Sequence, residues 1–234
     1  EEHFFAKKHV LWLEEVPEGE PAMSGKIVLS QEYLDLLTTG KASKPRFSMN
    51  FPAQLLETEM EWNDLVLNDD TLLQIRELEA WINHHPTLMT DWGMRKKFKP
   101  GYRTLFHGPP GTGKTLTATL LGRYTGKDVY KIDLSMVVSK FIGETEKNLA
   151  SLFARAENKD WILFFDEADA LFSKRTNVRD AHDKYANQEV SYLLQRVENY
   201  DGLVILATNF KSNLDDAFIR RFQAVVHFPM PRAN

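Results

Sequence analysis

The 234-residue sequence has no cysteine, which excludes a disulfide framework and a metal site built on thiolates. It also lacks a long hydrophobic run, since its longest apolar stretch, residues 161–165, is far too short to cross a bilayer. No secretory leader is visible at the start of the sequence, which begins at Glu1 rather than methionine. From these residues we expect a cytoplasmic protein without a membrane segment.

An excess of charge of one sign is also missing. The 29 lysines and arginines nearly balance the 33 aspartates and glutamates, and the formal net charge is −4. This balance disfavours a general nucleic-acid partner, because binding to nucleic acid requires a basic surface. Hydrophobic residues make up 43% of the sequence, which is enough for a sizeable core and argues against wholesale disorder.

What the sequence does contain is a phosphate-binding motif. Residues 108–115 fit the template G-x-x-x-x-G-K-[ST] at every fixed position, between a β-prone segment and a helix-prone one. Glycines let such a loop turn its backbone N–H groups inward, and the following helix N-terminus adds partial positive charge. The alternative is a glycine-rich turn with a lone lysine, which would not require a strand before it and a helix after it. We therefore expect nucleotide phosphates to bind at Gly108, Pro109, Pro110, Gly111, Thr112, Gly113, Lys114, Thr115 and Leu116.

Side chains of two segments predict a site for ATP or ADP with Mg²⁺. Lys114 is expected to reach the β- and γ-phosphates, and the Thr115 hydroxyl to ligate the metal. Asp166 and Glu167 follow the apolar stretch 161–165. We expect Asp166 to hold Mg²⁺, directly or through water, and Glu167 to act on the attacking water. The alternative is a pair of surface carboxylates that close a strand.

Strand-like and helix-like segments alternate from residue 102 onward, which predicts an α/β fold with a largely parallel sheet. Ligands of such sheets bind beyond the carboxyl ends of the strands, where Asn209 also falls. An uncharged amide suits a group that positions water near a γ-phosphate, and a turn-forming asparagine is the alternative. The five expected strands are residues 102–107, 128–134, 161–165, 202–207 and 224–228.

Residues 1–56 are predicted to be a partial N-terminal region and linker, which precedes an ATPase domain at residues 57–234. The first region contains two short strand-like segments and a helix-like segment at 31–37, with Ser30 as its N-cap. In the second region, apolar spacing predicts a helix that starts from a cap at residues 70–71 and ends near Pro86.

These motifs together resemble the large nucleotide-binding domain of the AAA+ ATPases, a P-loop NTPase fold, over about residues 57–231. Residues 108–115 match the Walker A motif of that family, and residues 162–167 resemble its Walker B motif. Asn209 falls at the sensor-1 position, and residues 213–222 are similar to the second region of homology.

The paired arginines Arg220 and Arg221, followed by phenylalanine, match the arginine-finger positions and resemble the katanin, spastin and fidgetin members. The resemblance implies that they serve the ATP of the neighbouring subunit in a homo-hexameric ring. The alternative is a basic helix end that suits the helix dipole. The resemblance also implies a sheet in the order 5-1-4-3-2, sandwiched by helices, and a nucleotide-contacting segment at Leu65 and Val66.

Residues 139–144 look like the first pore loop of the protein-remodelling members of the family. This likeness implies that a polypeptide substrate contacts Lys140, Phe141, Ile142 and Gly143, whereas ordinary core packing of Phe141 is the alternative. The family carries a small helical lid after this domain. Because the sequence stops where the lid begins, we expect the lid to be missing from residues 57–234.

The resemblance implies an ATP-driven motor subunit that remodels, unfolds or disassembles protein substrates through a hexameric pore. A nucleic-acid helicase or translocase is an alternative, because residues 166–169 spell the tetrapeptide Asp-Glu-Ala-Asp. Against it, such helicases use two lobes, whereas this chain has one phosphate loop and mildly acidic charge. A non-hydrolysing nucleotide-binding scaffold is a further alternative, which the presence of Glu167, Asn209, Arg220 and Arg221 disfavours.

Overall fold

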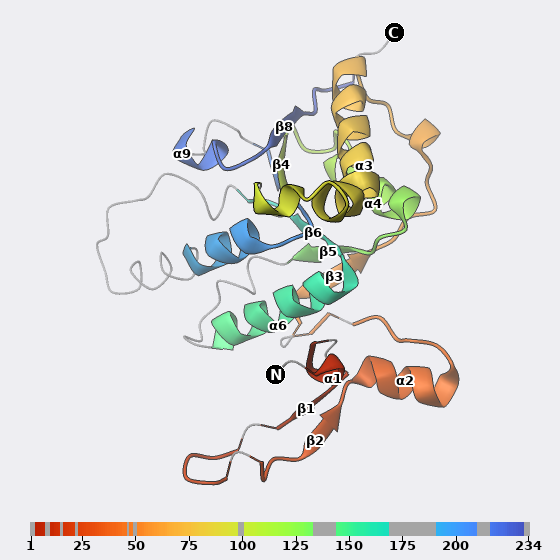
Figure 1. The fold of residues 1–234 in the computed structure, drawn as a ribbon. Helices are drawn as coiled ribbons and strands as arrows, with labels where there is room; N and C mark the ends of the chain where they lie inside the picture. The colour runs from red at the N-terminus through yellow and green to blue at the C-terminus, as the bar shows by residue number, and fades with distance from the viewer. Residues whose placement is uncertain are drawn as a thin grey trace, which may run out of the picture. The chain divides into compact units, whose positions relative to one another are not determined.

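The structure, a computed structural model, describes residues 3–7, 10–14, 16–21, 23–45, 47–48, 51–97, 101–132, 144–168, 191–209 and 216–231. The chain folds into two compact units, Glu1–Arg46 and Phe47–Asn234 (Figure 1). The second unit contains the phosphate-binding motif and the large sheet.

The first unit contains a two-stranded antiparallel sheet, in which Leu11 lies opposite Leu29. The Ser30 hydroxyl accepts a hydrogen bond from the Tyr33 N–H at 3.4 Å, so Ser30 caps the following helix as predicted. The predicted strands and helix of this unit are therefore confirmed. Its elements are α1 (Phe4–Lys7), β1 (Leu11–Leu13), β2 (Ile27–Leu29) and α2 (Gln31–Thr39).

Six strands form the sheet of the second unit: β3 (Ala53–Leu56), β4 (Tyr102–His107), β5 (Val129–Ile132), β6 (Ile162–Phe165), β7 (Leu203–Thr208) and β8 (Ala224–His227). Their order in the sheet is β3-β5-β6-β7-β4-β8. All neighbouring pairs are parallel except β3 and β5. Counted along the chain, β4 to β8 are the five predicted strands, and their order is therefore the expected 5-1-4-3-2.

Strand β3 corrects the prediction of a five-stranded sheet. It pairs antiparallel with β5, from Ala53 opposite Ile132 to Leu56 opposite Val129. The sequence of β3, Ala-Gln-Leu-Leu, is short and contains no β-branched residue, so it carries little strand signal of its own. Because β3 belongs to the sheet, the second unit starts at Phe47, before the boundary at residue 57 that the sequence predicts.

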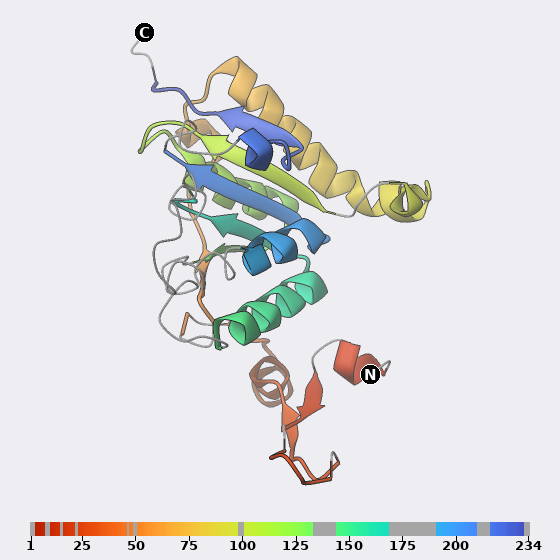
Figure 2. The ribbon, with the colours of Figure 1, turned by 90° about the vertical axis from the view of Figure 1, so that its left-hand side faces the viewer.

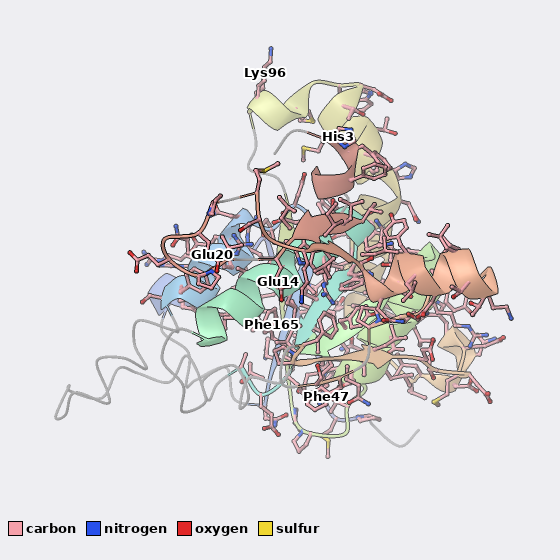
Figure 3. All side chains as sticks on the ribbon, turned by 90° about the horizontal axis from the view of Figure 1, so that it is seen from below. His3, Glu14, Glu20, Phe47, Lys96 and Phe165 are labelled. Atoms are coloured by element: carbon pink, nitrogen blue, oxygen red, sulfur yellow. The ribbon has the colours of Figure 1, made fainter. Side chains whose placement is uncertain are left out.

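Helices cover both faces of this sheet, as expected (Figure 2). On one face, Ile75 of α3 and Leu121 of α4 pack in a cluster with Phe106 of the sheet. On the other face, Leu152 of α6 packs in a cluster with Phe165, which is labelled in Figure 3. Residues 191–199 are also helical. The named helices of this unit are η1 (Trp62–Asp64), α3 (Asp69–Thr90), η2 (Met94–Lys96), α4 (Lys114–Thr125), α6 (Glu144–Lys159) and α9 (Asp216–Ile219).

Helix α3 is longer than the sequence predicts at both ends. Its N-cap is Asn68, whose side chain accepts a hydrogen bond from the Thr71 N–H at 2.8 Å. Thr71, which we expected at the cap, instead donates its hydroxyl proton to the His227 carbonyl at 2.6 Å and so ties α3 to β8. The helix also continues past Pro86 to Thr90, although a proline inside a helix removes one backbone donor and its ring clashes with the carbonyl four residues earlier.

No helix in the described part of the chain combines the length and the apolar character that a membrane crossing needs.

Candidate functional site

Three adjacent strands bring the predicted site residues to one edge of the sheet. Strand β7 lies between β4 and β6 and runs parallel to both, so their carboxyl ends meet at the same edge. Gly108 follows β4, Asp166 follows β6 and Asn209 follows β7. The Gly108 N–H donates to the Thr208 carbonyl at 3.3 Å, which joins the start of the loop to the end of β7.

Two glycines of the loop occupy positions that exclude a side chain. Gly108 has a φ of 154°, and a β-carbon there would lie 2.0 Å from the Phe228 carbonyl oxygen. Gly113 has a φ of 95°, and its β-carbon would lie 2.5 Å from a methyl group of Leu65. The Thr112 hydroxyl closes the loop internally by donating to the Pro109 carbonyl at 2.8 Å. The loop therefore folds tightly and leaves its amides at the N-terminus of α4.

The ammonium group of Lys114 lies at the centre of this arrangement. The residue is only 7% exposed. Its Nζ donates to the carbonyl oxygens of Gly108 at 2.6 Å and Pro109 at 2.9 Å, and to Asn209 Oδ1 at 3.1 Å. A positive charge is thus held between the loop and the end of β7, where an anionic ligand of the loop amides would meet it.

The two acidic residues after β6 have different surroundings. Asp166 Oδ1 accepts a hydrogen bond from the Glu167 N–H at 3.0 Å, and Asp166 Oδ2 lies 2.6 Å from Lys131 Nζ. Glu167 is exposed and has a φ of 52°, in the left-handed region that a residue with a β-carbon seldom adopts. Such strained backbone is often found at functional sites.

The oxygen atoms at this edge of the sheet suit a Mg²⁺ ion that also binds water and phosphates, rather than a metal site built from protein side chains alone. The described residues contain no cluster of three or more histidine, cysteine, aspartate or glutamate side chains that could hold a metal ion. Mg²⁺ is commonly bound through one or two protein oxygens together with water and substrate phosphates. The Asp166 carboxylate and the Thr115 hydroxyl supply oxygens of this kind.

The paired arginines lie just after α9, and both are exposed. The Arg221 guanidinium forms an ion pair with the Glu198 carboxylate, which belongs to the helical residues 191–199. Within the described part of the chain, Arg220 forms no ion pair. Glu198 carries no sequence signal of its own, since only the folded chain brings it close to Arg221.

The remaining predicted site residues divide into two groups. Leu65 and Leu116 are half-buried, and Val66, which follows Leu65 in sequence, is 72% exposed. The Leu65 side chain lies beside the loop at Gly113, and its contact with a nucleotide stays a prediction. The four expected pore-loop residues lie outside the described residues: Lys140, Phe141, Ile142 and Gly143.

Residues 104–230 match the model of the family "ATPase family associated with various cellular activities (AAA)". The chain belongs to this family. The match spans the strands that carry the phosphate loop, Asp166 and Asn209, so the fold is that of an AAA-domain P-loop NTPase.

Curated relatives agree with this assignment. Proteasome-activating nucleotidase 2 of Halobacterium salinarum is 35% identical over 173 residues, which are 71% of this chain and 41% of that protein. Proteasome-activating nucleotidase of Archaeoglobus fulgidus is 29% identical over 223 residues, 92% of this chain and 55% of that protein. Cell division protein C of Sulfolobus acidocaldarius is 30% identical over 184 residues, 74% of this chain and 47% of that protein.

The chain thus spans about half the length of the curated relatives it matches. The names of these relatives do not single out the katanin, spastin and fidgetin members that the paired arginines resemble.

Proposed function

We propose that the chain is the large ATPase domain of an AAA+ motor subunit, which binds and hydrolyses ATP to remodel protein substrates. The observation that carries this proposal is the buried Lys114 ammonium, which bridges the phosphate loop and Asn209 one strand away from Asp166. An anion-binding loop, a fixed positive charge, a neutral amide and a carboxylate at one sheet edge are the parts that phosphoryl transfer to water requires.

In this proposal each group has one task. Lys114 and the loop amides bind the phosphates, and Asn209 orients water near the γ-phosphate. Thr115 and Asp166 hold Mg²⁺, which neutralises phosphate charge when it is bound with the nucleotide. Glu167 accepts a proton from the attacking water or orients it.

Replacing Glu167 with glutamine tests hydrolysis directly. We expect Glu167→Gln to bind ATP nearly as well as the wild type, because the side chain is exposed and its shape is kept. Phosphate release should fall by about 10²–10⁴-fold, the usual contribution of a general base. Calorimetry measures the binding and a phosphate assay measures the turnover. The exposed Glu59→Gln is the matched control, and turnover close to wild type in Glu167→Gln would contradict the assigned role.

We further propose a polypeptide substrate and a homo-hexameric ring. The names of the archaeal nucleotidases say that they activate proteasomes, and the pore-loop resemblance of residues 139–144 agrees with a protein substrate. The narrower resemblance to katanin, spastin and fidgetin rests on Arg220, Arg221 and Phe222. A cytoplasmic location stays a prediction.

Replacing Phe141 with alanine tests the pore loop. An aromatic ring offers large apolar contact with few rotatable bonds, which suits a grip on extended polypeptide. We expect Phe141→Ala to keep the melting temperature and basal ATP hydrolysis of the wild type, and to lose unfolding of a tagged model substrate. Phe153→Ala is the control, because Phe153 is fully buried and its truncation should cost about 3–5 kcal/mol. A comparable loss of stability in Phe141→Ala would mean that Phe141 is a core residue.

Two other functions remain alternatives to this proposal. A nucleic-acid translocase would bind single-stranded DNA or RNA in a filter assay at stated salt, with an affinity that falls as salt rises. A nucleotide-binding scaffold would bind ATP without releasing phosphate, even when a lid-containing protein is assayed.

A further inference from the structure

A lysine that the sequence does not mark as functional contacts the carboxylate proposed to hold Mg²⁺. Lys131 lies on β5, which runs parallel to β6, and Lys131 is opposite Phe164 in the register. From there its Nζ reaches Asp166 Oδ2 at 2.6 Å. The two side chains are 37% and 26% exposed, so the pair is only partly open to solvent. Asp166 Oδ1 is already engaged by the Glu167 N–H, so Lys131 binds the other oxygen of the carboxylate.

We propose that Lys131 is a positioning residue that holds Asp166 in the absence of metal and competes with Mg²⁺ for its carboxylate. Lys131 then sets the magnesium concentration that the nucleotide site requires. This inference rests on the proposed function, because it takes Asp166 as the residue that holds Mg²⁺.

Charge gives the direction of the effect. An ammonium group and a magnesium ion have the same sign, and partial burial lessens the screening of their repulsion by water. Mg²⁺ therefore approaches Asp166 only if Lys131 moves away or shares the carboxylate. The lysine side chain allows such movement, because its charge sits on a flexible four-carbon stem.

A purely structural role of Lys131 leads to a different expectation. If the ion pair only joined β5 to β6, its loss would lower stability and would leave the coupling between metal and nucleotide unchanged. The chain offers a matched control, because Lys127 forms an ion pair with Asp160 just before the same strand. Asp160 precedes β6, whereas Asp166 follows it, so the two carboxylates lie at opposite ends of that strand, and Lys127→Met removes the same charge from a second lysine–carboxylate pair.

The test measures how strongly Mg²⁺ and nucleotide favour each other's binding. Fluorescent N-methylanthraniloyl-ADP is titrated into the 234-residue chain with EDTA and at a series of magnesium concentrations. The ratio of the two nucleotide affinities reports the coupling free energy between metal and nucleotide. We expect this ratio to rise about two- to fivefold in Lys131→Met, the range of a partly exposed ion pair. Lys131→Arg and Lys127→Met should keep the wild-type ratio, and thermal melts check the folding of every variant.

A second comparison tests whether Lys131 changes the affinity ratio through the Asp166 carboxylate. In an Asp166→Asn background, Lys131→Met should change the ratio no further, because the partner that both cations share is gone. An unchanged or lower ratio in Lys131→Met with normal wild-type binding would overturn the role of Lys131 and leave the proposed function standing. If Lys131→Met melts early, Lys131→Gln provides the same measurement with a polar side chain. A wild-type chain that fails to bind the nucleotide would overturn the proposed function and this inference together.

Discussion

Replacing Lys114 with alanine should abolish measurable ATP binding. The residue is 7% exposed, and its ammonium group is the charge that the structure holds between the loop carbonyls and Asn209. In the proposed site, where Lys114 binds the β- and γ-phosphates, the substitution would remove at least two charge-assisted hydrogen bonds to them. Because each contributes about 1.5–3 kcal/mol, we expect the dissociation constant to rise by a factor of about 10²–10⁴. Isothermal calorimetry with ATP and Mg²⁺ measures this change.

A control separates the lost charge from lost folding. Lys96→Ala removes a lysine that is exposed in η2 and points away from the rest of its unit (Figure 3), so ATP affinity should not change. Lys114→Ala itself leaves the carbonyl oxygens of Gly108 and Pro109 without one donor, so its thermal melt is recorded beside the wild type. A folded Lys114→Ala protein with wild-type affinity would remove Lys114 from the phosphate site.

The regular elements near the site could be predicted because their signals are local. Fully buried strands read as apolar runs, so the ends of β6 and β7 were visible in the sequence, together with Asp166 and Asn209 after them. The order of the strands came from the resemblance to a family rather than from any periodicity. Strand β3 was missed because its identity as a strand depends on pairing with β5, more than seventy positions away in sequence.

The contacts inside the site could not be predicted in the same way. The Lys114–Asn209 bond joins residues 95 positions apart, and the Lys131–Asp166 pair joins residues 35 positions apart. Which charged side chains contact each other depends on strand order and register, and local sequence patterns predict neither of them. The motifs therefore pointed to the residues of the candidate site, and only the fold revealed Lys131 and Glu198 as the partners of Asp166 and Arg221.

Arg220→Ala and Arg221→Ala should each leave ATP binding nearly intact and cut hydrolysis by about 10³–10⁵-fold, as arginine fingers that act across an interface do. Both residues are exposed and follow α9, so neither is needed for the core. Arg221 is paired with Glu198 in the isolated chain and must leave that carboxylate to reach a neighbouring subunit. Arg76→Ala, which removes an exposed arginine of α3, is the matched control.

The decisive measurement for the arginines is rescue by mixing, in a protein that forms rings. A Lys114→Ala subunit binds no ATP but keeps both arginines, whereas an Arg220→Ala subunit keeps its ATP site. When the two variants share a ring, intact arginines lie next to an intact ATP site at some interfaces, and part of the hydrolysis should return. Native mass spectrometry verifies that mixed rings form. If hydrolysis stays absent in verified mixed rings, Arg220 does not act across the interface. The loss of hydrolysis in the Arg220→Ala variant then has a cause within the same subunit.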